Sequence, residues 1–151
     1  MKPAKSLKRK EGLNMAKVYA MIANGTEEVE CLAVVDLLRR SGVETVLVSV
    51  EEDCEIISSH KVRITADAVL ADTDLSDGDV IFLPGGMPGA ERLSACGPLL
   101  EALEQADREG RRIAAICAAP GVVLGRHGLL KGRTATCFPG FEKEFGHGRY
   151  T

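Results

Sequence analysis

A short apolar run that ends at a cysteine is the feature that most restricts how this chain can fold. Residues 113–116 (IAAI) have the length and composition of a buried parallel strand, and Cys117 follows at once. Residues 118–124, with Pro120 near their start, predict the first turns of a helix. Cys117 is therefore expected at a strand-to-helix corner, at the carboxyl edge of a sheet, where α/β proteins bind ligands.

Two roles are open to a cysteine at this corner. The positive end of a helix favours thiolate over thiol, and the same geometry places the serine of a nucleophile elbow. A buried cysteine also serves as a small apolar core residue. The corner alone does not decide between a reactive and a structural Cys117.

The rest of the chain alternates between apolar strands and helices. Thr26 is expected to cap a helix that reaches about Arg40, with its apolar face on the sheet, and Pro98 opens another that stops at Gly110. A shorter helix is expected over residues 89–95. Strands are predicted at residues 17–23, 43–50, 79–83, 113–116 and 133–137, with a hairpin or edge pair from 54–59 and 61–70. This order predicts a parallel, doubly wound α/β sheet.

Three further residue groups have local signals. The glycine pair at 85–86 follows a predicted strand, where backbone N–H groups can approach a ligand closely. The pattern is neither a dinucleotide fingerprint nor a P-loop. Taken alone, Glu30 suits an exposed helix position, while His60 and His127 suit structural roles in turns.

Composition excludes several classes of protein. The chain has 151 residues, which is enough for one domain. Its formal net charge is -3, and its one basic cluster lacks the interleaved aromatics of a nucleic-acid arm. Residues 1–14 are expected to form a flexible extension ahead of a single domain at 15–151. No secretory signal or membrane span is predicted. The five cysteines form no CxxC pair, which favours a reducing cytoplasm over a zinc ribbon or disulfide framework.

Three motifs together resemble the ThiJ/PfpI superfamily, and most closely its DJ-1 branch. They are residues 25–30 (GTEEVE), 83–86 (LPGG) and 114–120 (AAICAAP), in matching order and spacing. The similarity runs from about Met15 to Thr151. It implies a flavodoxin-like three-layer αβα sandwich with a mainly parallel sheet, and a homodimer.

The resemblance also implies a catalytic site. Cys117 would be the nucleophile and Glu30 the protonated glutamate hydrogen-bonded to its sulfur, acting as acid and base. Gly85, Gly86 and Ala118 would supply backbone groups facing an oxyanion. Members of this branch are described as glyoxalase III, which turns methylglyoxal into lactate without glutathione, or as protein deglycases. No metal or cofactor is expected, and the partner would be a small aldehyde.

The sequence departs from other members of the superfamily. Ala118 stands where protease-like members have histidine, and the downstream histidine and glutamate of class I glutamine amidotransferases are not matched, which disfavours both activities. A third pocket residue is expected near His147 or Arg149, and His60 lines up with a residue that reaches across the family dimer. Family members continue through another strand and helix, so the C-terminal part of their fold is expected to be missing here.

Two other functions fit the same residues. Cys117 could be oxidised to a sulfinic acid held by Glu30 in an oxidative-stress sensor or chaperone. Alternatively, the chain is a flavodoxin-like domain without catalytic activity. A reactive thiol beside a carboxyl group suits the α-oxoaldehyde enzyme and the oxidative-stress sensor equally. The sequence therefore does not separate the enzyme from the sensor.

Overall fold

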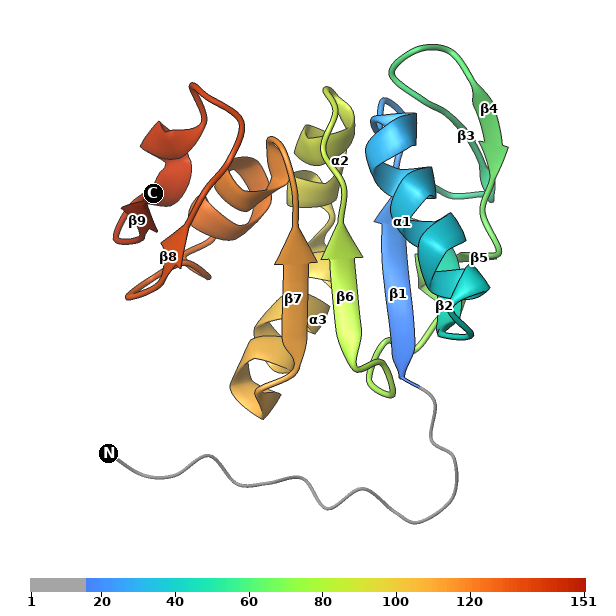
Figure 1. Ribbon diagram of the computed structural model, residues 1–151, viewed down its shortest axis with the longest axis horizontal. Helices are drawn as coiled ribbons and strands as arrows, with labels where there is room; N and C mark the ends of the chain where they lie inside the picture. Colours follow the sequence, from blue (N-terminus) through green and yellow to red (C-terminus); the bar gives the residue numbers. More distant parts are fainter. Residues whose placement is uncertain (1–15) are drawn as a thin grey trace.

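The central element is a five-stranded sheet in which all the neighbouring strands are parallel. The computed structural model describes residues 16–151, and the sheet order is β5-β2-β1-β6-β7 (Figure 1). The strands are β1 (Lys17–Ile22), β2 (Glu44–Ser49), β5 (Ala68–Val69), β6 (Val80–Leu83) and β7 (Arg112–Ala115). The predicted parallel α/β sheet is confirmed. The predicted extension at residues 1–14 lies outside the described residues.

Helices cover both faces of the sheet and make a three-layer sandwich. Helix α1 (Glu28–Arg40) lies on one face, while α2 (Gly89–Ala95) and α3 (Gly97–Glu109) lie on the other (Figure 1). Strand β1 serves both layers because successive side chains point to opposite faces. Its residues Tyr19 and Met21 pack in the α3 core, and Val18, Ala20 and Ile22 pack in the α1 core. Within residues 16–151, no helix is both long and apolar enough to cross a membrane.

Helix α1 starts one residue later than its sequence predicts. Glu27, not Thr26, is the N-cap, and its side chain accepts a hydrogen bond from the Glu30 N–H at 2.7 Å. The Thr26 hydroxyl is already engaged, because it accepts a hydrogen bond from the Ala23 N–H. Val29, expected on the buried face with Leu32, Val35 and Leu38, is 68% exposed. Leu32, Val35 and Leu38 pack on the sheet as expected, together with Cys31.

A hairpin lies beside the N-terminal end of α1. It consists of β3 (Glu55–Ile57) and β4 (Arg63–Thr65), which pair antiparallel as predicted. The predicted strand over residues 61–70 is divided, because β5 leaves the hairpin to pair with β2. A short 3₁₀ helix, η1 (Leu70–Asp72), then leads towards β6.

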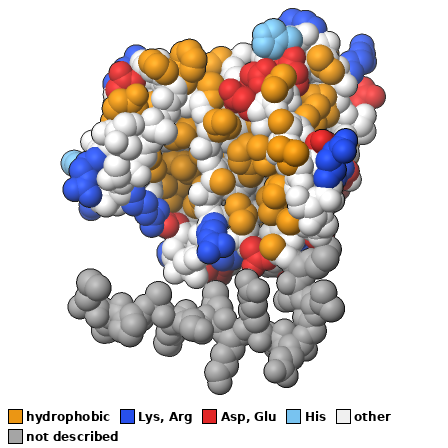
Figure 2. All heavy atoms as spheres, viewed as in Figure 1, with side chains coloured by type: hydrophobic (Ala, Val, Ile, Leu, Met, Phe, Trp, Pro, Cys, Tyr) orange, Lys and Arg blue, Asp and Glu red, His pale blue; other side chains and the backbone are white. Residues whose placement is uncertain are grey.

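The segment around Cys117 differs most from its prediction. Strand β7 is the outermost strand of the sheet, and its side chains alternate between half-buried and exposed positions instead of being buried throughout. Ile116, just after it, is 44% exposed, and apolar side chains are visible over the part of the sheet face that α1 leaves open at β6 and β7 (Figure 2). The expected helix is a single π-helical element, η2 (Pro120–Gly125).

The remaining chain forms a small subdomain next to β7. Strands β8 (Thr134–Ala135) and β9 (Arg149–Tyr150) pair in parallel, and the 3₁₀ helix η3 (Glu142–Phe145) lies between them in sequence. The predicted strand at 133–137 is thus shorter and lies outside the main sheet. A cavity of about 510 Å³ separates β7 from β8, with Ile113, Leu129 and Thr134 among its lining residues.

Candidate active site

Cys117 occupies a strained corner directly after β7. Its φ angle is 61°, in the left-handed region that residues other than glycine rarely adopt. The backbone on either side is fixed, since the Ile116 N–H donates to the Leu83 carbonyl at 3.2 Å and the Phe138 N–H donates to the Cys117 carbonyl at 2.7 Å. Such a corner presents a side chain at the carboxyl edge of the sheet, as in a nucleophile elbow.

The Glu30 carboxyl group lies beside the Cys117 sulfur, because a Cβ added at Gly85 would be 2.7 Å from Glu30 Oε2 and 3.0 Å from Cys117 Sγ. Glu30 lies in the first turn of α1, where the Glu27 cap holds its backbone N–H. Its Oε2 atom also accepts a hydrogen bond from the Gly85 N–H at 2.9 Å. Glu30 is therefore not an ordinary exposed helix residue, because its carboxyl group lies between the Gly85 N–H, in the turn after β6, and the Cys117 sulfur.

Two backbone N–H groups complete the surroundings of the sulfur. Those of Gly86 and Ala118 both act on Cys117 and lower the pKa of its thiol. A side chain at Gly85 would place its Cβ 2.5 Å from the Cys117 Cβ and 2.7 Å from Glu30 Oε2. At Gly86, φ is 86° and a Cβ would overlap the Glu27 backbone nitrogen. Glycine is thus required at both positions for the backbone to approach the thiol.

The pKa of the Cys117 thiol lies above its ordinary value. Burial is the main cause, and the hydrogen bond and negative charge of Glu30 act in the same direction. The N–H groups of Gly86 and Ala118 lower the pKa but do not outweigh burial. The predicted lowering of the thiol pKa at the start of the helix is therefore present, but burial outweighs it and the net shift is upward.

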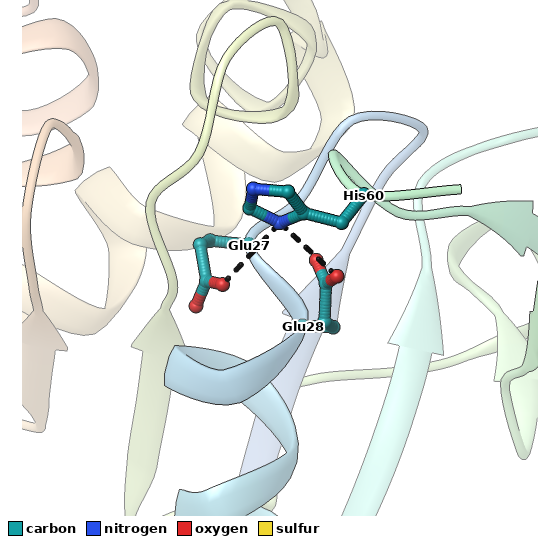
Figure 3. A group of neighbouring side chains, drawn as sticks. All are labelled: Glu27, Glu28 and His60. Atoms are coloured by element: carbon teal, nitrogen blue, oxygen red, sulfur yellow. Dashed lines mark ion pairs between the residues drawn. The ribbon is translucent and has the colours of Figure 1, made fainter. Parts of the chain in front are cut away.

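The other predicted site residues lie elsewhere. His60 is in the β3–β4 turn beside Glu27 and Glu28 (Figure 3). His147 and Arg149 are exposed, and Arg149 belongs to β9. His127 has the structural role expected of it, since its Nε2 atom is 2.9 Å from the hydroxyl of the buried Ser94.

Sequence reasoning missed two aromatic residues beside Cys117. Phe138 donates its backbone N–H to the Cys117 carbonyl, and Phe141 packs against the same cluster as Cys117, Ala118 and Val122. The two rings meet edge to face with centroids 6.3 Å apart. The signal was the spacing of two phenylalanines around a proline and a glycine (FPGF, residues 138–141) directly after the last predicted strand.

Known proteins resemble this chain in sequence and in fold. The model of the DJ-1/PfpI family matches residues 16–151. Protein DJ-1 homolog B of Arabidopsis thaliana is 42% identical over 125 residues, which cover 83% of this chain and 28% of that protein. The glutathione-independent glyoxalase DJR-1.2 of Caenorhabditis elegans is 35% identical over 111 residues, covering 74% and 58% respectively.

Solved structures give the same result. The structure described as oxidized Toxoplasma gondii DJ-1 superimposes with a TM-score of 0.83 at 41% identity, covering 86% of this chain and 71% of that one. The chain thus spans well under a third of the Arabidopsis protein and somewhat more than half of the nematode glyoxalase. Since the family model covers all of the described fold, the chain belongs to the DJ-1/PfpI family.

Proposed function

We propose that this protein is a cysteine-dependent enzyme that converts small α-oxoaldehydes into hydroxy acids, as in methylglyoxal to lactate, without a cofactor. The observation that carries the proposal is the position of the Cys117 sulfur beside the Glu30 carboxyl group, where the backbone N–H groups of Gly86 and Ala118 lower the thiol pKa. These are a nucleophile, a proton carrier and oxyanion donors, the three functions that the reaction needs. The relative named as a glutathione-independent glyoxalase supports this substrate class.

The first step forms a carbon–sulfur bond. Glu30 takes the thiol proton, and the Cys117 sulfur attacks the aldehyde carbon to give a hemithioacetal. The aldehyde oxygen becomes negative as its π bond breaks. The N–H groups of Gly86 and Ala118, which act on the thiol in the free protein, would stabilise that charge until Glu30 passes the thiol proton to the oxygen and is again a carboxylate.

The second step moves hydrogen between the two carbonyl carbons. Glu30 removes the proton from the former aldehyde carbon, which gives an enediol, and returns it to the neighbouring carbon. The first carbon is oxidised to a thioester and the second is reduced to an alcohol, so no external oxidant or reductant is consumed. Water then hydrolyses the thioester, releasing the hydroxy acid and restoring the thiol of Cys117.

Lactate production from methylglyoxal, measured without glutathione, tests the proposal. Cys117→Ser is expected to abolish turnover, and Glu30→Gln to lower kcat by about 10²- to 10⁴-fold, because glutamine cannot carry the proton. Cys54→Ser is the matched control, since Cys54 is another half-buried cysteine away from the site. Its turnover should equal that of the unmodified chain. Equal turnover in Cys117→Ser would exclude the proposed nucleophile.

Deglycation of proteins is the closest variant of this proposal. In an adduct of methylglyoxal with an amine or thiol, the Cys117 sulfur would bond to the former aldehyde carbon as the bond to the amine or thiol breaks and that group leaves with a proton, and the same proton transfer would follow. Release of lactate from a glycated peptide, compared with release from free methylglyoxal, distinguishes the two substrates. Both activities require Cys117 and Glu30, so the variants above serve for either.

Oxidation of Cys117 is a second function with its own support. The relative from Toxoplasma gondii was described in an oxidized form. Two equivalents of peroxide would convert the thiol to a sulfinic acid with release of two waters, and Gly86 and Ala118 offer N–H groups to the new oxygens. Intact mass after mild peroxide should show two added oxygens that Cys117→Ser lacks. Uptake spread equally over the other cysteines would contradict a sensor.

A catalytically silent domain is the remaining alternative. Alkylation of Cys117 no faster than that of Cys54 or Cys96, together with no lactate formation, would favour it.

We further propose a homodimer located in the cytoplasm. The five cysteines are all free thiols, in keeping with a reducing compartment. Light scattering on the purified protein would give the oligomeric state, and a monomer at working concentrations would exclude the dimer.

A further inference from the structure

We propose that Glu27, Glu28 and His60 together bind a divalent transition-metal ion of the Zn²⁺ type. The Nδ1 atom of His60 lies 3.1 Å from Glu28 Oε1 and 3.8 Å from Glu27 Oε1 (Figure 3). One donor atom from each residue lies within 4.8 Å of the others. Metal–ligand bonds of about 2.0–2.2 Å separate neighbouring donors by about 3–3.5 Å, so small side-chain rotations complete the site.

In both Glu27 and Glu28, one carboxylate oxygen accepts a hydrogen bond from the protein and the other is available to a metal ion. Glu27 Oε2 accepts the Glu30 N–H at 2.7 Å as the cap of α1. Glu28 Oε2 accepts the hydroxyl hydrogen of Ser59 at 3.0 Å. The Oε1 atoms of both residues face the His60 imidazole. Outer hydrogen bonds of this kind orient metal ligands and raise affinity.

The backbone also fixes the two segments that supply the donors. The Ser59 N–H donates to the Thr26 carbonyl at 2.9 Å, and the Gly25 N–H donates to the Ile57 carbonyl at 2.8 Å. The Asn24 side chain adds a third link by accepting the Ile57 N–H at 2.8 Å. The β3–β4 turn and the start of α1 are therefore locked together, and the three donors are brought close without a metal.

The charge of this cluster favours a cation. Among residues 16–151, His60 is the one basic side chain that pairs with Glu27 or Glu28. Two carboxylates with an imidazole make an oxygen–nitrogen donor set. Zn²⁺ and its neighbours in the first transition row accept that set, whereas Mg²⁺ and Ca²⁺ prefer oxygen alone.

Calorimetric titration of the whole chain with Zn²⁺ tests the site. One equivalent should bind, and His60→Ala should weaken binding more than Ser59→Ala, which should cost about 10- to 100-fold through the lost hydrogen bond to Glu28. His147→Ala is the matched control, because His147 is also exposed but belongs to the subdomain beside β7. It should bind Zn²⁺ like the unmodified chain. Absence of binding, or binding that His60→Ala leaves unchanged, would overturn the proposal.

Cysteines also bind Zn²⁺, so the ligand atoms need a separate measurement. Co²⁺ bound by carboxylate and imidazole gives weak visible bands, whereas thiolate ligation adds a strong charge-transfer band in the near ultraviolet. We expect the weak bands alone, their loss in His60→Ala, and their persistence in Cys117→Ser. A charge-transfer band that disappears in Cys117→Ser would assign the metal to the thiol and refute the site at His60. Turnover of methylglyoxal is not part of this test, so failure of one proposal leaves the other standing.

Discussion

At the scale of single residues, the candidate site depends on two glycines, which have no side chain, as much as on Cys117 and Glu30. Gly85 brings its N–H to Glu30 because no Cβ separates the strand end from Cys117. Gly86 turns its N–H to the sulfur with a positive φ that costs glycine little. These two residues make the reactive atoms approach one another at distances that any side chain would prevent.

Replacing Gly85 by alanine should therefore damage the site. The new methyl group would meet the Cys117 Cβ at 2.5 Å and Glu30 Oε2 at 2.7 Å, so the sulfur and carboxyl group must move apart. We expect a lower kcat for lactate formation and a lower melting temperature. Gly97→Ala is the control, because a Cβ there meets nothing within 4 Å at the start of α3. That variant should be as stable as the unmodified chain or gain about 0.4–1 kcal/mol. Unchanged turnover in Gly85→Ala would contradict the described geometry.

Which residues form the site was largely predictable, but their electrostatics were not. Cys117, Glu30 and Gly86 lie in short motifs with fixed spacing, so a resemblance identifies them without any structure. The direction of the thiol pKa depends on burial, which no local motif contains. The contact of Phe138 with Cys117 similarly requires the chain to return across the sheet edge. The clustering of His60 with Glu27 and Glu28 was missed for the same reason.

At the scale of secondary-structure elements, the start of helix α1 combines two functions. Glu27 caps the helix and thereby holds Glu30 at the sulfur, while Glu28 faces the β3–β4 turn. Acidic residues in a first turn also interact favourably with the helix dipole. One turn of helix thus connects the candidate active site to the proposed metal site.

The pKa of Glu28 predicts how acid weakens this element. Burial would raise this pKa, but hydrogen bonds lower it from 4.5 to about 2 in the folded protein. Glu28 therefore stabilises the fold fully above pH 4.5, and this contribution disappears as the pH falls from 4.5 towards 2. Urea unfolding of Glu28→Gln with a chelator present should show a stability deficit at neutral pH that shrinks on acidification. A deficit that stays constant down to pH 2 would refute this role.

The prediction of helices and strands succeeded where the apolar periodicity and the turn residues at the element ends agree. Strand β1 and helix α3 follow their apolar patterns and end at turn residues, and the structure confirms both. The π-helical η2 has no such signature, because Pro120 and the small residues around it also suit an ordinary helix. Strand β7 has the composition of a buried strand, but its position at the sheet edge follows from the order of strands.

At the scale of the whole molecule, stability comes from two apolar cores on opposite faces of the sheet. The larger one joins α3 to residues such as Met21 and Ile81, and the smaller one joins α1 to Ile22 and Phe82. Burial of these side chains is the main favourable term in folding. Most of the site is held by elements that contribute to one or both cores.

Leu103 of α3 is a suitable probe of the larger core, because it is fully buried. Leu103→Ala should lower the free energy of unfolding by about 2–5 kcal/mol through lost contacts and a residual cavity. Leu37→Ala on α1 is the control, since Leu37 is 63% exposed and should change stability by about 0.5 kcal/mol or less. Urea denaturation monitored by circular dichroism measures both. Equal losses in the two variants would contradict the described core.

Strand β7 leads to Cys117 and lies at an edge of the sheet. Among the described residues it has one partner strand, β6. Local opening at an edge strand requires less free energy than unfolding the cores. We therefore expect the amide hydrogens of residues 112–117 to exchange with deuterium faster than those of β1, which lies between two strands. Heating should accordingly abolish the proposed lactate formation before the chain unfolds, with the temperature of half-inactivation falling below the midpoint of unfolding.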